Sequence, residues 1–405
     1  MNRNKIILTA FFVLVMISAV FAYRLFSDKD GRDLYFNVNG SGGGHTFVTA
    51  QERQQVNDRI TASRNNLITE TVKAVSPAVV GINVTEVVQY QDPWSNDPFF
   101  RQFFGDRSYN QEVKSLGSGT IISPDGYILT NDHVAGNGVK ITVTMTGGKQ
   151  YTAKKIGTDP ASDVCLLKID GSNLPYIPMG NSDDVLTGEW VIALGNPFGL
   201  FEINDQPTVT VGVISAKGMN LEPDNNRYYL GMLQTDAAIN RGNSGGPLVN
   251  SVGELIGMNT LIFTADGSSG NIGLGFAIPI NKAKRIITEL KDKGYVDRNF
   301  KIGLDAQTID EGIAQYYKLP STRGAIVTDV KRNSPAEKAG LEPGDIIVDV
   351  EGNKIVNRSS LVGAFQEFRT GQTITLTIIR DKQTLNKKMR LEKNNDRKIY
   401  TPRNG

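Results

Sequence analysis

The stretch Asn240-Arg-Gly-Asn-Ser-Gly-Gly-Pro-Leu248 places three glycines and a proline around one serine, Ser244. Ordering a glycine in place of an alanine costs about 0.5–1 kcal/mol, so such a run needs a structural or chemical reason. Two reasons fit the residues. Asn-Gly and Ser-Gly pairs are typical of surface turns. Alternatively, Ser244 is a nucleophile in a tight loop whose backbone N–H groups converge on a developing negative charge.

A serine hydroxyl is a weak nucleophile at neutral pH and needs a base within hydrogen-bonding reach. The chain has only two histidines, His45 and His133. His45 follows the flexible tract Gly40-Ser-Gly-Gly-Gly44, where nothing fixes its geometry, and we expect it to be exposed. His133 comes directly after the apolar stretch Tyr127-Ile-Leu-Thr130 and is the candidate base.

The base in turn needs a carboxylate that orients the imidazole and stabilises its charged form. Asp163 immediately precedes the apolar run Val164-Cys-Leu-Leu167 and is the preferred candidate. Asp159 precedes a proline, and we interpret it as the residue that opens a turn. Asp132 adjoins His133, and neighbours on a strand or at its end point apart. The sequence therefore favours Asp163 over both alternatives.

Most of the chain before residue 280 reads as short strands separated by turns, with almost no long helical pattern. Pro124-Asp-Gly126 and Gly147-Gly148 are the clearest turn signals. About 200 residues of this kind fit two small closed barrels better than one sandwich. The predicted fold class is therefore mainly β.

After this region the pattern changes. Ile280 to Lys293 has helix-period apolar residues and is followed by Gly294, a typical C-cap. A second, mixed α+β domain is predicted from about residue 300 to 391. Its strand candidates are Gly324–Val330, Ile346–Val350 and Thr373–Arg380, and its helix candidates are Pro335–Ala339 and Ser359–Phe368.

The composition excludes several classes of function. Forty-four basic and 42 acidic residues leave a formal charge of +2 in 405 residues, so no domain-scale basic excess is available for nucleic acid. The single cysteine, Cys165, lies in an apolar run and is interpreted as a core residue. Neither H-E-x-x-H nor paired C-x-x-C is present, and we expect no metal and no cofactor.

The N-terminus carries Arg3 and Lys5 before an apolar run, residues 6–22. This arrangement predicts export, either as a signal peptide cleaved after Ala22 or as a retained membrane anchor. Residues 23–65 are polar and glycine-rich and are interpreted as a flexible linker. Residues 393–405 are interpreted as a disordered tail.

The order His133, Asp163, Ser244 is that of chymotrypsin, distinct from the orders of the subtilisins and the α/β-hydrolases. With this order in place, residues 71–392 resemble the HtrA (Deg) family of serine proteases, in which a trypsin-like domain is followed by a PDZ domain. The motifs that carry the resemblance are Gly117-Ser-Gly119, Thr130-Asn-Asp-His-Val134, Ser162-Asp-Val-Cys-Leu-Leu-Lys168, Gly195-Asn-Pro-Phe-Gly199 and Thr235-Asp-Ala-Ala-Ile-Asn-Arg-Gly-Asn-Ser-Gly-Gly-Pro-Leu248. Val164 and Cys165 depart from the family's usual Leu-Ala but preserve an apolar pair.

This resemblance implies a chymotrypsin-like double six-stranded β-barrel at residues 66–292 and one PDZ domain at residues 298–392. It implies the triad His133, Asp163 and Ser244, and an oxyanion hole formed by the backbone N–H groups of Gly242, Asn243 and Ser244. Gly245 and Gly246 would let the substrate backbone approach. An aliphatic substrate pocket is implied at Ile239, Asn259, Thr260, Leu261 and Ile262, although ordinary barrel core is an equally good interpretation of the aliphatic members.

In the second domain, Lys301-Ile302-Gly303-Leu304 resembles the PDZ loop that binds a C-terminal carboxylate, and Ser334-Pro-Ala-Glu-Lys-Ala-Gly-Leu-Glu-Pro-Gly-Asp345 is characteristic of the module. Backbone N–H groups near Gly303 would hold the carboxylate while the peptide adds a strand to a sheet edge. The aromatic-rich segment Gln91–Phe104 resembles the family's regulatory loop. The resemblance also implies a homotrimer.

The resulting hypothesis is an exported, periplasmic or envelope-bound serine endopeptidase that degrades unfolded, damaged or mislocalised proteins under stress, as part of protein quality control. Two alternatives remain open. One is an anchored regulatory protease with a specific signalling substrate. The other is a scaffold that binds unfolded chains without cleaving them.

Overall fold

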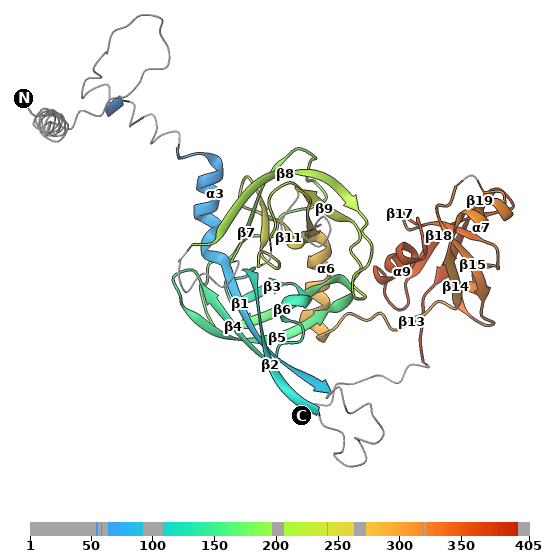
Figure 1. Cartoon of the computed structure of the whole chain (residues 1–405), viewed down its shortest axis with the longest axis horizontal. Coiled ribbons are helices and arrows are strands. Elements are labelled where there is room, and N and C mark those ends of the chain that lie inside the picture. The colour runs from blue at the N-terminus through green and yellow to red at the C-terminus, as the bar shows by residue number, and fades with distance from the viewer. Residues whose placement is uncertain are drawn as a thin grey trace, which may run out of the picture. The chain divides into compact units, whose positions relative to one another are not determined.

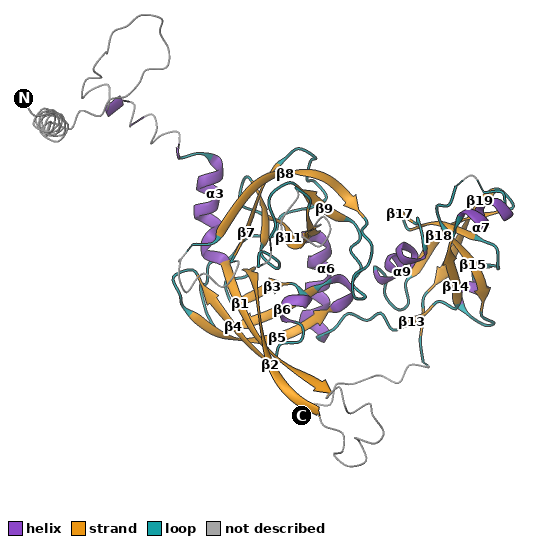
Figure 2. Ribbon diagram, viewed as in Figure 1, coloured by secondary structure: helices purple, strands orange, loops and turns teal. Residues whose placement is uncertain are grey.

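The computed structural model describes residues 54–55, 58, 64–91, 108–196, 206–240, 242–262, 273–319 and 321–395. The predicted export segment, most of the predicted linker, His45 and the aromatic segment after Gln91 lie outside these ranges. Within them, no helix combines the length and apolar character that a membrane crossing requires. Strands predominate over helices in the described chain (Figure 2).

The first barrel closes on itself through six antiparallel strands (Figure 1). In their order around the barrel they are β1 (Val79–Gln91), β2 (Ser108–Ile121), β3 (Tyr127–Thr130), β6 (Val164–Ile169), β5 (Gln150–Asp159) and β4 (Lys140–Met145). Fully buried aliphatic side chains such as Ile82, Ile128 and Leu166 fill its interior. The predicted turn at Gly147 and Gly148 joins β4 to β5, and both glycines have positive φ, as this hairpin requires.

The second barrel repeats the architecture. Around this barrel the order is β10 (Pro247–Asn250), β11 (Leu255–Ile262), β12 (Gly275–Pro279), β9 (Met232–Thr235), β8 (Thr208–Met219) and β7 (Trp190–Gly195). Ile192, Leu194 and Leu248 are fully buried. The predicted pair of six-stranded barrels is therefore confirmed.

Helix α6 (Ile280–Lys293) follows the second barrel and ends as predicted. Gly294 adopts φ 80° and donates its N–H to the carbonyl of Leu290. One face of the helix, including Ile286 and Leu290, is buried. It contacts strands of both barrels, namely β5 and β6 of the first and β11 and β12 of the second, so it fastens the two together.

The C-terminal domain is a mixed sheet with short helices. Its strands run in the order β14 (Leu304–Thr308), β15 (Ala325–Val330), β16 (Ile346–Val350), β18 (Thr373–Arg380) and β19 (Gln383–Arg390), with β17 (Asn353–Lys354) on β16 and a separate pair formed by β13 (Phe300–Lys301) and β20 (Glu392–Lys393). The helices are α7 (Glu311–Tyr316), α8 (Pro335–Lys338) and α9 (Arg358–Gln366). The predicted α+β PDZ fold is confirmed, and β14 stands at one end of the sheet order.

Helices α3 and α7 were not predicted. Helix α3 (Leu67–Val75) begins with a capping box in which Asn66 and Thr69 bond each other's backbone N–H. Helix α7 is capped by the Asp310 side chain, which accepts from the Ile313 N–H at 2.8 Å. Because none of the α7 residues is buried, this helix leaves no apolar periodicity in the sequence. The N-cap residue Asp310 was the feature of the sequence that could have indicated this helix.

Candidate active site

His133 lies on α5 (Asp132–Ala135), a single turn that follows β3 through Asn131. The end of the strand therefore delivers the imidazole to the barrel surface, where its side chain is 33% exposed. Val134 on the same turn packs so closely on β2 that a Cβ at Gly117 would lie 2.5 Å from its methyl group. This packing fixes the position of the turn that carries His133.

Asp163 follows the 3₁₀ turn η3 (Pro160–Ser162) and adopts φ 57°, a left-handed conformation that is uncommon for a residue with a side chain. Its carboxylate is completely buried. The Oδ2 atom lies 2.8 Å from His133 Nδ1, and Oδ1 accepts the His133 backbone N–H at 3.0 Å. The carboxylate thus holds both the ring and the backbone of His133, so that Nδ1 carries a proton and Nε2 is left to act as the base.

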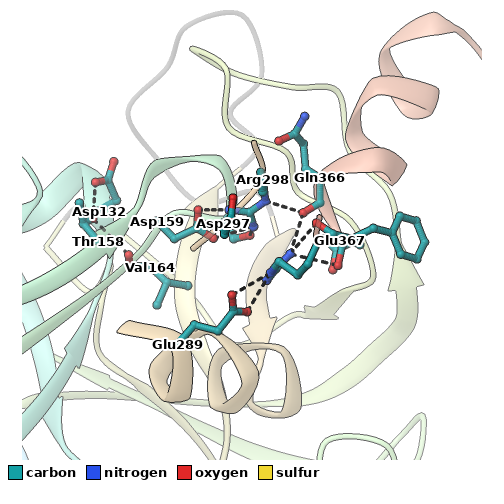
Figure 3. Close-up of polar contacts among 12 residues, drawn as sticks. Asp132, Thr158, Asp159, Val164, Glu289, Asp297, Arg298, Gln366 and Glu367 are labelled. Atoms are coloured by element: carbon teal, nitrogen blue, oxygen red, sulfur yellow. Dashed lines mark hydrogen bonds and ion pairs between the residues drawn. The ribbon is translucent and has the colours of Figure 1, made fainter. Parts of the chain in front are cut away.

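Asp132 has a different environment, as the sequence argument proposed. Its Oδ1 accepts from Thr158 Oγ1 at 2.6 Å (Figure 3), and its Oδ2 accepts from Arg227 Nη2 at 3.1 Å. Neither oxygen contacts the imidazole in the hydrogen bonds of the described chain. Asp163 is therefore the carboxylate that orients the histidine.

Thr260 has a role that the sequence analysis missed. Its hydroxyl donates to Asp163 Oδ2 at 2.8 Å and accepts from Asn131 Nδ2 at 3.0 Å. Its carbonyl oxygen accepts from Ser244 Oγ at 3.1 Å. Thr260 therefore connects the serine to the aspartate, and the three predicted residues converge on one place between the barrels. Its position on a strand rather than in a recognisable motif left no sequence signal for this role.

Ser244 donates to the Thr260 carbonyl rather than to the His133 imidazole in this conformation. The backbone around it is tightly held: the Ser118 N–H donates to the Ser244 carbonyl at 2.9 Å. Rotation of χ1, a motion of a single side chain, is what would redirect the hydroxyl toward the base. A proton transfer from this hydroxyl to His133 would require that rotation.

The glycines of the serine loop are explained by backbone shape and close packing. Gly242 has φ 94° and Gly245 has φ 84°, conformations that disfavour other residues. A Cβ at Gly245 would lie 2.1 Å from the Ser118 carbonyl oxygen, and one at Gly246 would lie 2.2 Å from that of Leu194. Packing against the protein itself therefore requires glycine at both positions, and their role in leaving room for substrate stays a prediction.

The oxyanion prediction changes in one respect. The Asn243 N–H donates to the Asn240 carbonyl at 3.0 Å, so this conformation does not offer it to a substrate. Gly242 and Ser244 remain the predicted donors.

Asp159 occupies the N-cap position of η3, so it opens a turn before Pro160 as predicted. Its side chain makes no cap hydrogen bond to η3. Instead it pairs with Arg298, whose Nη2 lies 2.8 Å from Asp159 Oδ2 and 3.0 Å from Ser162 Oγ (Figure 3). The Nε of Arg298 donates to the Gln366 carbonyl at 2.5 Å. Arg298 therefore stabilises η3, the turn that precedes Asp163.

Cys165 is fully buried, as predicted for a core residue. Burial raises the pKa of its thiol to about 12, so the thiol is not ionised at neutral pH and cannot compete as a nucleophile.

Residues 117–258 match the family model of the trypsin-like peptidase domain, and residues 301–391 match that of the PDZ domain. A probable periplasmic serine endoprotease, DegP-like, from Chlamydia trachomatis serovar D is 46% identical over 300 residues, which is 72% of this chain and 58% of that protein. Its counterpart from Hahella chejuensis is 43% identical over 326 residues, covering 77% of this chain and 67% of that protein. The solved structure of the HtrA-type protease AlgW with a decapeptide has a TM-score of 0.60 and 36% identity, covering 80% of this chain and 98% of that one.

The chain belongs to the HtrA family of serine endoproteases. It spans about 58% of the length of the chlamydial DegP-like relative.

The predicted substrate pocket of this HtrA protein is only partly described. Ile239 is buried. Asn259 is also buried, and its Nδ2 donates to the Pro247 carbonyl at 2.9 Å, so it supports the serine loop from within the barrel. Leu261 and Ile262 belong to β11, but their side chains lie outside the described part of the structure. A substrate-binding role for all five residues stays a prediction. The contacts seen for Asn259 and Thr260 are structural: Asn259 bonds the Pro247 carbonyl, and Thr260 bonds the Asp163 carboxylate.

The predicted carboxylate loop of the HtrA PDZ domain leads from β13 into β14. Gly303 has φ 77°, and a Cβ there would lie 2.1 Å from that of Ser334. Its carbonyl accepts the Lys331 N–H at 2.9 Å, and the Ile302 carbonyl accepts the Ala336 N–H at 3.0 Å. The loop is thus fixed from the carbonyl side, which suits a site built from the N–H groups on its other side.

Proposed function

We propose that this protein is an exported serine endopeptidase that degrades unfolded or damaged proteins in the cell envelope, as a homotrimer whose PDZ domain recognises C-terminal peptides. The DegP-like relatives, which are named as periplasmic, support the location. The observation that carries the activity is the buried Asp163 carboxylate, 2.8 Å from both His133 Nδ1 and Thr260 Oγ1, with Ser244 bonded to the same threonine.

The chemistry follows from these contacts. Ser244 Oγ turns from the Thr260 carbonyl to His133 Nε2, gives up its proton and attacks the scissile carbonyl carbon. The Gly242 and Ser244 N–H groups stabilise the oxyanion. His133 then donates the proton to the leaving amine, and a water molecule hydrolyses the acyl-enzyme by the reverse sequence. Asp163 keeps its hydrogen bond to His133 Nδ1 and so stabilises the imidazolium that forms.

A fluorophosphonate probe tests this assignment. We expect the native full-length protein to be labelled on Ser244, because phosphonylation needs a serine activated by a neighbouring base. Mass spectrometry of the digested protein locates the adduct, and the Ser244→Ala variant is the control. If Ser244 stays unmodified in the presence of casein, the scaffold hypothesis is favoured. An adduct on another serine would instead contradict the assignment of Ser244 as the nucleophile.

The PDZ proposal rests on β14 at the end of the sheet order and on the left-handed Gly303 just before it. We expect a fluorescein-labelled peptide with a free apolar C-terminus to bind more tightly than the same peptide amidated at that end. The loss should be about tenfold, since hydrogen bonds to a charged group contribute more than neutral ones. Fluorescence polarisation measures both affinities. Equal affinities would contradict carboxylate recognition.

A further inference from the structure

The segment between β8 and β9 is an ordered hairpin rather than an open loop. We define the hairpin as residues 220–231. The Leu221 N–H donates to the Tyr229 carbonyl at 2.9 Å, and Asp224 and Arg227 exchange backbone hydrogen bonds of 3.1 and 2.8 Å. Asn225 and Asn226 occupy the tip with φ of 48° and 61°, which asparagine tolerates better than most residues.

This hairpin is fastened to the turn that presents the catalytic carboxylate. The Tyr228 N–H donates to the Ala161 carbonyl of η3 at 2.8 Å. Because Ala161 lies two residues before Asp163, this bond fixes the position of the hairpin relative to the Asp163 carboxylate. Arg227, the preceding residue, is thereby directed into the site.

Arg227 lies between two carboxylates. Its Nη2 donates to Asp132 Oδ2 at 3.1 Å, and its Nε lies 3.4 Å from Asp163 Oδ1. The arginine side chain is 18% exposed, whereas that of Asp163 is completely buried. This is not a surface ion pair, so the interaction is less screened by solvent than most.

Arg227 interacts with Asp163 mainly through its charge, because no hydrogen bond joins the two side chains. The Arg227 Nε is buried and makes no hydrogen bond within the described chain. Both oxygens of Asp163 are already engaged by His133, and Oδ2 also by Thr260. Arg227 therefore adds a positive charge beside the carboxylate without replacing any bond that orients the imidazole.

We propose that Arg227 is a positioning residue that acts through Asp163 to keep His133 unprotonated, and therefore able to act as a base, at a lower pH than the triad alone would allow. This inference rests on the proposed function. A guanidinium beside the carboxylate offsets part of the charge that stabilises the imidazolium. The acid limb of the pH–activity profile should therefore lie at a lower pH than it would without the guanidinium.

Among the groups beside the pair, the Tyr229 phenol provides no such charge. Burial raises the pKa of the Tyr229 phenol, and the nearby Asp163 carboxylate raises it further, so the phenol stays neutral. For Arg227, burial lowers the pKa, but Asp163 and Asp132 outweigh it, and the pKa lies above its ordinary value. The other ionisable groups close to this cluster are Asp132 on α5, Lys155 and Asp159 on β5, Cys165 on β6, Asp224 on the hairpin, and Arg298. Lys155 and Arg298 are cations, but Lys155 bonds the Gly136 carbonyl and Arg298 bonds Asp159 and Ser162, so neither contacts the Asp163 carboxylate in the hydrogen bonds of the described chain.

The test is the pH dependence of kcat/KM for unfolded fluorescein-casein with the full-length protein. Arg227→Gln removes the charge, so the imidazolium becomes easier to form and the acid limb should move to higher pH by about 0.5 to 1 unit. Arg227→Lys retains the charge and should leave the limb near its wild-type position. Arg285→Gln, which removes an exposed arginine of α6, is the matched control.

The proposal is overturned if the acid limb of the kcat/KM profile does not shift in Arg227→Gln. It is also overturned if the limb of Arg227→Lys shifts as far as that of Arg227→Gln. If Arg227→Gln melts below the assay temperature, Asp132→Asn replaces it. Because Asp132→Asn itself removes a negative charge next to His133, it is compared with the double variant Asp132→Asn/Arg227→Gln. The acid limb of the double variant should lie at higher pH than that of Asp132→Asn, and equal limbs would overturn the proposal. Ser244→Ala is run in parallel: cleavage by that variant would refute the proposed function itself, independently of Arg227.

Discussion

Replacing Ser244 by alanine should reduce kcat for unfolded casein by about 10⁶-fold, as expected when the nucleophile of a serine protease triad is removed. The physical reason is that no other described group can attack the scissile carbonyl at this place, since Cys165 is buried and protonated at neutral pH. Casein binding should persist, because the variant loses one oxygen atom and its bond to the Thr260 carbonyl. Turnover is measured by peptide release and binding by fluorescence anisotropy.

Ser251→Ala is a matched control in the turn between β10 and β11, because Ser251 contributes only its backbone carbonyl to the bond from Thr71 Oγ1. It should cleave casein at the wild-type rate. Cleavage by Ser244→Ala within about a hundredfold of wild type would contradict the assignment, because the residual catalysis left by such variants is far smaller. Loss of binding along with turnover would instead indicate a folding defect, which a thermal melt detects.

The sequence was sufficient to predict the two barrels, the PDZ domain and the residues that meet at the site. Strand periodicity and turn glycines are local properties, and Gly126, Gly147 and Gly148 all adopt the positive φ that their turns require. His133 and Asp163 could be paired because few candidates existed: there are two histidines in the whole chain, and Asp163 directly precedes the apolar run Val164-Cys-Leu-Leu167. The small number of histidines therefore made it possible to assign the base from the sequence.

The interactions that the sequence did not reveal join segments distant along the chain. Thr260 is 97 residues from Asp163, and its hydroxyl is one of many in the barrels. Arg227 and Arg298 look like ordinary surface arginines until the hairpin and the segment before β13 are placed beside η3. The ion pair of Asp159 was missed for the same reason, since the sequence shows the turn that this aspartate opens but not its partner Arg298, 139 residues away.

Local patterns also could not separate a glycine that makes room for substrate from one that packs against the protein. Gly245 illustrates this. Its positive φ belongs to the loop, but the atoms that a Cβ would meet are the Ser118 carbonyl and Thr130 Oγ1 of the first barrel. The serine loop of the second barrel is therefore shaped to fit the first. The site forms only when both barrels are in place.

Asp163→Asn should lower kcat by about 10⁴-fold while preserving the fold, because it changes the tautomer of the base rather than the shape of the site. The carboxylate accepts from His133 Nδ1, from the His133 backbone N–H and from Thr260 Oγ1. An amide has only one acceptor oxygen. If that oxygen keeps the backbone or the threonine bond, the NH₂ group faces Nδ1 and requires Nδ1 to accept, which moves the ring proton to Nε2. An Nε2 that carries a proton cannot take one from Ser244.

The measurement is kcat for casein, compared with Asp170→Asn, an exposed aspartate just after β6 that carries the same charge change. The thermal midpoint of Asp163→Asn should fall, since the buried Arg227 then has only Asp132 as a charge partner. A loss of kcat below tenfold in folded protein would mean that Asp163 holds His133 for structural reasons alone. A loss confined to KM would mean that it shapes the binding site. Only a large fall in kcat, with KM little changed, fits a carboxylate that sets the proton position on the base.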